Sequence, residues 1–236
     1  MDETPNLALP LVQPSQAQKH VTVNEALVRL DAGAQLVLAD TGISVPPGSP
    51  DEGVCYGVPV GATGAWQGHE GEVAVEDNGG WSFLSPREGW RAWDRASVRG
   101  LVHDGSGWRV EGLATAPSGA GARFVTQEAL HSVTAGTDNT TALVIPAKSM
   151  VFAASARVTS DITGSAPTWS LGVAGATDRF GSGLGMGQGG FADGILGTPQ
   201  TYYSDTALVI SGEGGDLSGG TVRLALHYIA FDLPDL

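Results

Sequence analysis

Apolar and polar residues alternate along most of the second half of the chain. Segments such as TALVIP, SMVFAASARVTSDI and TVRLALHYIAFDL have the two-residue period of β-strands, and turn-forming residues separate them. In the last segment, alternate residues from Val222 to Tyr228 are apolar on one face, and Ala225, Ile229 and Phe231 are apolar on the other. Such a strand lies centrally in a sandwich or at a subunit contact. The pattern predicts a jelly-roll-like β-sandwich over residues 124–236.

A helical period appears once, between residues 22 and 38. Thr22 and Glu25 match the capping box T-x-x-E, and the apolar positions that follow have the spacing of one helix face. We predict a helix of about four turns, preceded by an extended, proline-containing arm. The helix either packs on the following domain or bundles with copies of itself, since so short a stripe does not specify an oligomer. In the second case the contacting residues are Val23, Leu27 and Leu30.

The segment between the helix and the sandwich contains an internal repeat. Residues 75–81 and 102–108 share the pattern V-x-D-x-x-G-W. Each copy predicts a hairpin in which an Asx-type turn is followed by a return strand opening on tryptophan. This region is therefore expected to be a small Trp-rich β domain.

These patterns divide the chain into four parts. Residues 1–40 are the predicted arm and helix, 41–112 the Trp-rich β domain, 113–123 a Gly/Ala/Pro-rich linker, and 124–236 the sandwich. The fold class that we expect is mainly β.

Composition narrows the possible partners. The net charge is −13, with charged residues at 16 % of the chain. A nucleic-acid partner is not expected, because binding to phosphates requires a cationic surface. No stretch approaches the roughly 18 apolar residues of a membrane span, so membrane insertion is not expected either. The acidic start MDETPNLALP has no signal-peptide pattern, which predicts synthesis in the cytosol.

The stretch GLGMGQGG, residues 183–190, contains a match to the dinucleotide fingerprint G-x-G-x-x-G. That fingerprint requires a helix directly after the glycines, and here Gly194, Gly197 and Pro199 interrupt any helix. We therefore interpret it as a loop between strands, with no nucleotide cofactor. Its glycines permit a close approach of chains, either around a symmetry axis, which we favour, or at a ligand groove.

Candidate catalytic groups are sparse. The five histidines lack metal-ligand spacing, no G-x-S-x-G is present, and Cys55 lies in an apolar run, so no metal, cofactor or nucleophile is expected. The acidic pairs Glu70/Glu72 and Glu76/Asp77 are the remaining candidates for polysaccharide cleavage. Adjacent residues on a strand point to opposite faces, which argues against the second pair.

Aromatic residues are the best candidates for a ligand site. Tryptophan stacks on sugar rings but also fills small β cores, and for the Trp-rich segment the core interpretation is the stronger. Adjacent tyrosines on a strand face opposite ways, so one of them is expected to be exposed. The candidate glycan-binding residues are Trp169, Tyr202, Tyr203, Trp81 and Trp108.

Longer strings carry a family resemblance. LPLVQPSQAQKHVTVNEALVRLDA, PVGATGAWQGHEGEVAVEDNGGWSFLSPREGWRAW and LVHDGSGW resemble a domain of unknown function found in alphaproteobacterial prophages and gene transfer agents. SLGVAGATDRFGSGLG and GTPQTYYSDTALVISGEGG look like the β-sandwich that follows that domain in head-spike proteins of those particles.

The resemblance implies a non-catalytic spike or fibre protein on the surface of a phage-like particle released by lysis. Its implied partners are copies of itself, a capsid or second spike protein, and the capsular polysaccharide of a recipient cell. Phage fibres are mostly trimers, whereas a capsid vertex has fivefold symmetry, and the sequence leaves trimer and pentamer open. Two alternatives also stay open: a particle-borne polysaccharide-degrading enzyme and a structural connector without a ligand.

Overall fold

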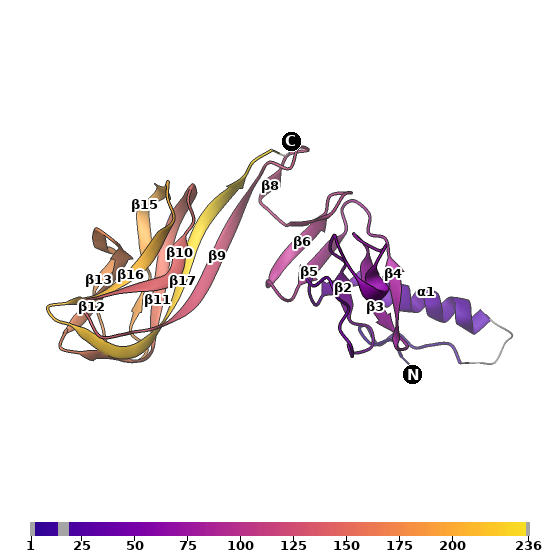
Figure 1. Cartoon of the computed structure of the whole chain (residues 1–236), viewed down its shortest axis with the longest axis horizontal. Helices are drawn as coiled ribbons and strands as arrows, with labels where there is room; N and C mark the ends of the chain where they lie inside the picture. The colour runs from indigo at the N-terminus through magenta and orange to yellow at the C-terminus, as the bar shows by residue number, and fades with distance from the viewer. Residues whose placement is uncertain (1–2, 14–18, 235–236) are drawn as a thin grey trace. The chain divides into compact units, whose positions relative to one another are not determined.

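The computed structural model describes residues 3–13 and 19–234 and forms two compact units, Met1–Glu111 and Gly112–Leu236 (Figure 1). The predicted mainly β fold is confirmed. The predicted boundary at residue 40 falls inside the first unit, because the end of the helix and the strands share one core. Part of the predicted arm, residues 14–18, lies outside the described residues.

The N-terminal unit is a seven-stranded sheet with one α-helix. The strands run in the order β4-β3-β2-β1-β5-β6-β7, and β1 is parallel to both of its neighbours. The elements are α1 (Lys19–Ala34), β1 (Val37–Leu38), β2 (Cys55–Gly57), a 3-10 helix (Gly64–Trp66), β3 (Val73–Asp77), β4 (Gly80–Leu84), β5 (Arg91–Asp94), β6 (Arg99–His103) and β7 (Trp108–Val110).

The predicted helix exists, but both of its predicted ends are wrong. Helix α1 begins at Lys19, so Thr22 lies inside it and does not act as its cap. It ends at Ala34, and Val37 and Leu38 form β1 instead. Leu38 pairs with both Cys55 and Asp94, and it is fully buried. Pairing with two distant strands gives the backbone N–H and C=O groups of β1 hydrogen-bond partners on both sides. This pairing outweighs the local pattern that favours a longer helix.

Two apolar clusters hold this unit together. Ala32, Leu36 and Leu38 join residues of β2, β3, β5 and β6 in one cluster. A second cluster gathers around Trp66 from the loop after β2, packed against Tyr56 and Trp81. The burial of these side chains is the main source of the unit's stability.

Both predicted hairpins are present. The β3–β4 turn has positive φ at Asn78 (54°) and Gly79 (79°), as a two-residue type I′ turn requires. Between β6 and β7, the carboxylate of Asp104 accepts hydrogen bonds from the backbone N–H groups of Ser106 and Gly107, which is an Asx-type turn.

The C-terminal unit is a sandwich of two antiparallel sheets. One has the strand order β10-β16-β12-β13, and the other β14-β11-β17-β9-β8, with β15 also paired to β11. Its strands are β8 (Ala114–Thr115), β9 (Gly121–Ser132), β10 (Asp138–Ile145), β11 (Ser149–Gly164), β12 (Thr168–Val173), β13 (Ala176–Leu184), β14 (Phe191–Ala192), β15 (Ile195–Tyr202), β16 (Thr206–Glu213) and β17 (Leu217–Asp232).

The connections of this sandwich are those of a jelly roll. From β9 onward, each sheet contains strands from both the beginning and the end of the unit. The last strand, β17, therefore lies between β9 and β11 (Figure 1). Alternate residues of β17 from Val222 to Tyr228 are buried between the sheets. The prediction of a central strand is thus confirmed.

The predicted linker is wrong. Within residues 113–123, β8 pairs antiparallel with the start of β9, and Ala116 and Ala120 close the hairpin. The boundary between the units falls between Glu111 and Gly112, one residue before the predicted end of the Trp-rich β domain. The small residues form a tight hairpin, which composition alone does not distinguish from a linker.

Residues 183 and 184 of the glycine stretch end β13, and residues 185–190 form a loop that leads into β14, so a strand and not a helix follows the glycines. Within the chain, the loop makes a close approach to β11. The N–H of Gly189 donates to the carbonyl of Val158, and the N–H of Val158 donates to that of Gly190. A Cβ at Gly190 would lie 2.4 Å from the Gly185 oxygen. The loop therefore needs glycine to pack on β11 and on itself.

Candidate functional site

The five candidate glycan-binding aromatics are divided between the two units, with Trp81 and Trp108 in the N-terminal one and Trp169, Tyr202 and Tyr203 in the C-terminal one. In the N-terminal unit, Trp81 is half-buried, with its ring centroid 5.1 Å from that of Trp66. Trp108 is also half-buried and meets His103 edge-on at 5.2 Å. Both side chains therefore contribute to packing, as the core interpretation holds.

In the C-terminal unit, one candidate is ruled out. Trp169 has no exposed surface, and its indole N–H donates to the carbonyl of Gly185 at 3.0 Å. A side chain without exposed surface cannot stack on a sugar, so the assignment of Trp169 as a ligand residue is wrong. Tyr202 is 9 % exposed and Tyr203 is 84 % exposed, so the pair does face opposite ways.

In the first acidic pair, Glu72 is held by contacts within the N-terminal unit. Glu72 accepts hydrogen bonds from Ser85 at 2.6 Å and from His69 at 2.7 Å, and these contacts lower its pKa. A general acid needs a raised pKa instead. Glu70 is exposed and precedes β3, while Glu76 is buried in β3.

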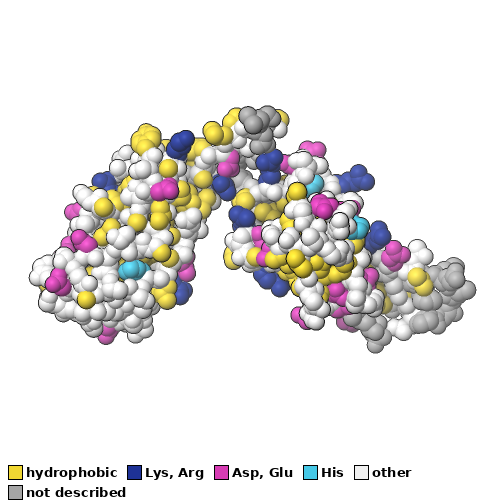
Figure 2. Space-filling model, in the orientation of Figure 1, with side chains coloured by type: hydrophobic (Ala, Val, Ile, Leu, Met, Phe, Trp, Pro, Cys, Tyr) yellow, Lys and Arg dark blue, Asp and Glu magenta, His cyan; other side chains and the backbone are white. Residues whose placement is uncertain are grey.

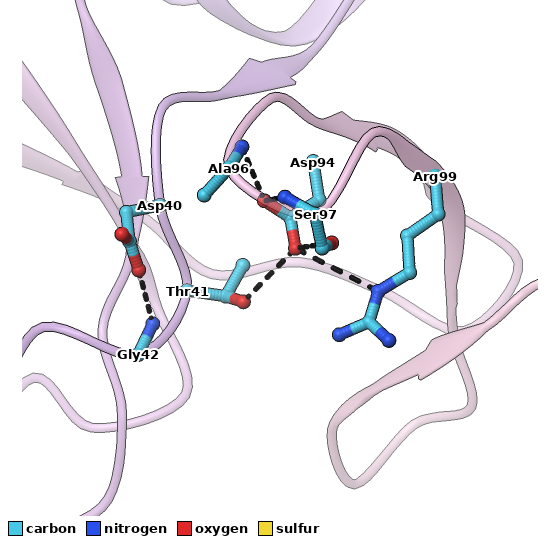
Figure 3. A network of polar contacts seen from close by, with 7 residues as sticks. All are labelled: Asp40, Thr41, Gly42, Asp94, Ala96, Ser97 and Arg99. Atoms are coloured by element: carbon cyan, nitrogen blue, oxygen red, sulfur yellow. Dashed lines mark hydrogen bonds and ion pairs between the residues drawn. The ribbon is translucent and has the colours of Figure 1, made fainter. Parts of the chain in front are cut away.

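A buried carboxylate, Asp94, is occupied by structural contacts (Figure 3). It is 2 % exposed and accepts hydrogen bonds from the N–H of Ala96 at 3.1 Å and from the hydroxyls of Ser97 and Thr41. The Arg99 guanidinium lies 3.8 Å away. These contacts fix the β5–β6 turn against the loop after β1, so Asp94 is a structural residue.

Cys55 and the possible metal ligands are the other candidate reactive groups. Burial, together with the charge of Asp31, raises the pKa of Cys55 to about 12, so its thiol is protonated at neutral pH. Among the described residues, no group of three or more His, Cys, Asp or Glu side chains is placed to hold a metal ion. Within residues 3–13 and 19–234, no helix is long and apolar enough to cross a membrane.

The outer face of the larger jelly-roll sheet carries an open hollow of about 330 Å³. Cross-strand pairing places Phe191, Arg157, Arg223 and Leu130 in one row across β14, β11, β17 and β9. All four side chains are exposed, whereas their neighbours Ala192, Ala156 and Leu224 are buried in the core. No local sequence pattern predicts this row, because its members come from four separate segments.

The next row forms the floor of the hollow. It consists of the small residues Ser155 and Ala225, with Glu128 at its end. Beyond the floor stands His227, whose Nδ1 is 3.1 Å from the Thr126 hydroxyl and whose Nε2 is 3.3 Å from the Ser155 hydroxyl. Successive rows on one face are about 7 Å apart. Small side chains between two larger rows therefore create the hollow.

Each unit also has an exposed apolar surface. On α1, Val23 and Leu30 are 44 % and 55 % exposed, and Leu27 on the same face is half-buried. On the outer face of the jelly roll, the exposed Phe124 ring lies 5.7 Å from that of Phe152. Figure 2 shows hydrophobic side chains on the surface of the C-terminal unit between few, scattered charged groups.

Comparison with known proteins gives a match for part of the chain. Residues 23–109 match the family described as "Protein of unknown function (DUF2793)". The expected domain of unknown function is thus confirmed for this segment, which covers less than half of the chain. No curated protein matches the sequence.

Among solved structures, the chain resembles one described as "Cyanophage Pam1 capsid asymmetric unit". The identity is 24 %, the TM-score is 0.34, and the alignment covers 50 % of this chain and 93 % of that chain. At this TM-score a shared fold is not established, and no function follows from the likeness.

Proposed function

We propose that the protein is a non-catalytic spike or fibre protein of a phage-like particle, of the gene transfer agent type, that attaches the particle to capsular polysaccharide. The sequence resemblance motivates this proposal. The observation that carries the adhesive part is the hollow on the exposed face of the jelly roll, with the aromatic side chain of Phe191 at its edge. Jelly rolls occur in capsid proteins and in lectins, a parallel by fold analogy only.

The contacts around the candidate catalytic groups favour adhesion over cleavage. Glu72 has a lowered pKa, and the Cys55 thiol has a raised one. Among the described residues, the hydrogen bonds of His227 are to the two hydroxyls of Thr126 and Ser155, so no carboxylate there completes a catalytic triad. These features support a site that binds a polymer and leaves it intact.

The exposed apolar surfaces support a homo-oligomer. Val23, Leu27 and Leu30 form a stripe with coiled-coil spacing on α1. Apolar surface of this kind is stabilised when a second copy covers it. The particle-side partner, a capsid or second spike protein, would then contact the N-terminal unit, which carries the DUF2793 match.

The test is binding of the purified full chain to capsulated and acapsular recipient cells and to the isolated capsular polysaccharide. We expect binding only where the capsule is present, with the polymer length unchanged after incubation. A shortened polymer would establish the degrading enzyme instead. Equal or absent binding to both cell types would leave the connector without a ligand.

A further inference from the structure

We propose that the hollow on the outer face of the β14-β11-β17-β9 sheet binds a carboxylate-bearing sugar of an acidic polysaccharide, held by Arg157 and Arg223. This inference rests on the proposed adhesive function and specifies its ligand class. It begins from the pairing of the two arginines, which are direct cross-strand partners on β11 and β17. Like charges directly opposite each other on a sheet repel, and an anion bound between them removes this repulsion.

Among the described residues, the two arginines together make one loose ion pair, with Glu128. Arg157 has no carboxylate at ion-pair distance among the described residues, and its guanidinium lies over the Phe191 ring, 5.8 Å from the centroid. Arg223 has one carboxylate neighbour, Glu128, with Nε and Oε1 3.7 Å apart and both side chains more than half exposed. Such an exposed pair contributes little and leaves the guanidinium N–H groups available for a ligand.

The rest of the lining favours a sugar over a bare anion. Phe191 is 54 % exposed and offers an aromatic face to the C–H side of a sugar ring. Glu128 and Asp193 also line the hollow, and their carboxylates accept hydrogen bonds from hydroxyl groups. The same two carboxylates would repel a doubly charged phosphate monoester more strongly than a singly charged carboxylate. A uronic acid carries one carboxylate and several hydroxyls. The carboxylate can accept hydrogen bonds from the two arginines, and the hydroxyls can donate to Glu128 and Asp193.

The floor of the hollow gives a polymer room to pass. Ser155 and Ala225 are small, and the hollow is open on the face of the sheet. A chain of linked sugars can therefore extend beyond the hollow in both directions, which an enclosed cavity would not allow. This geometry fits an internal segment of a polysaccharide.

The test measures binding of the full-length protein to a galacturonic acid hexamer and to the same hexamer with its carboxyl groups reduced to alcohols. We expect binding of the acidic hexamer, weakening as salt is added, and affinity at least about tenfold lower for the reduced hexamer. Equal affinity for the two hexamers, or binding of neither, would overturn the assignment.

Variants locate the site. Arg157→Gln and Arg223→Gln should each weaken binding of the acidic hexamer about tenfold. The matched control is Arg179→Gln, which removes the same charge from β13, where the side chain contacts Gln200. Arg157→Lys keeps the charge but loses the bidentate geometry, so an intermediate affinity is expected. Wild-type affinity in both glutamine variants would overturn the proposal.

Stability provides an independent readout. Arg157→Gln should leave the melting temperature of the free protein unchanged or higher, because it removes a like-charge contact, and at the same concentration the acidic hexamer should raise the melting temperature of the wild type more than that of the variant. Binding of capsulated cells by the double glutamine variant as strongly as by the wild type would refute this site and leave the adhesive function standing. Hexamer binding through the arginines, without binding to capsulated cells, would refute the adhesive function and leave the site standing.

Discussion

Thr4 and Asp31 are 27 residues apart in the sequence, and the Thr4 hydroxyl donates a 2.5 Å hydrogen bond to the buried Asp31 carboxylate. The backbone N–H groups of Asn6 and Leu7 donate to the same carboxylate at 3.0 and 2.6 Å. Asp31 therefore ties the N-terminal arm to helix α1. Burial by itself raises the pKa of Asp31, but these hydrogen bonds outweigh it and lower the pKa.

Removal of this carboxylate should loosen the arm. We expect Asp31→Ala to reduce the free energy of unfolding of the N-terminal unit by about 3 kcal/mol, since several donors lose their acceptor. Urea unfolding measures the change, and limited proteolysis should show earlier cleavage within residues 3–13. The control is Glu25→Ala on the same helix, which removes an exposed pair with Arg29 and should cost less than about 0.5 kcal/mol. Equal effects of the two variants would contradict the role of Asp31.

Stability should decrease in acid. The pKa values of Asp31, Glu72 and Asp104 are all lowered in the folded protein, the last by its hydrogen bond from Arg109. Near pH 4 these carboxyl groups bind protons in the unfolded protein but stay charged in the folded one, so folding releases protons. The stabilisation is therefore present above about pH 4 and is lost as the pH falls further. Urea unfolding at a series of pH values measures this slope. Asp104→Asn should make the slope shallower, and an unchanged slope would contradict the assignment.

The burial of Trp169 predicts a stability effect instead of a binding effect. Trp169→Ala should cost about 3–5 kcal/mol, because it leaves a cavity between the sheets. Tyr203→Ala, at a side chain that is 84 % exposed, should change stability by less than about 0.5 kcal/mol. Thermal or urea unfolding followed by tryptophan fluorescence distinguishes the two. A mild effect at Trp169 would contradict its place in the core.

Two glycines near β14 should respond differently to alanine. A Cβ at Gly194 would lie 1.8 Å from the Ala154 carbonyl oxygen, and its φ is +56°. Gly194→Ala should therefore cost about 3 kcal/mol or more, or prevent folding. Gly187→Ala is the control, because nothing lies within 4 Å of its Cβ position. Circular dichroism and the melting temperature measure both variants, and equal melting temperatures would contradict the close approach.

The exposed stripe of α1 predicts the state of association. We expect the full chain to be an oligomer by light scattering, and Leu30→Glu to shift it toward the monomer, because a charge would be buried at the contact. Val60→Glu makes the same kind of change at a side chain that is 94 % exposed, outside the helix, and should leave the mass unchanged. The same mass for wild type and Leu30→Glu would refute an interface at this stripe.

The sequence by itself determined the local elements. Period-two alternation located strands such as β10, β11 and β17, and the V-x-D-x-x-G-W repeats located two hairpins with their turns. These features depend on neighbours within a few residues, so composition and spacing are enough to specify them. The exposure of one tyrosine in the pair Tyr202 and Tyr203 followed for the same reason.

The tertiary structure decided what depends on distant partners. Leu38 became a strand because it pairs with β2 and β5, and Trp169 became a core residue because two sheets close over it. The row from Phe191 through Arg157 to Arg223 exists only after strand register has brought separate segments together. Register is set by long-range hydrogen bonding and core packing, and no local pattern encodes which strand a residue will face. The candidate site therefore emerged from the fold: β11 and β17 were predicted from the sequence, whereas β9 and β14 were not.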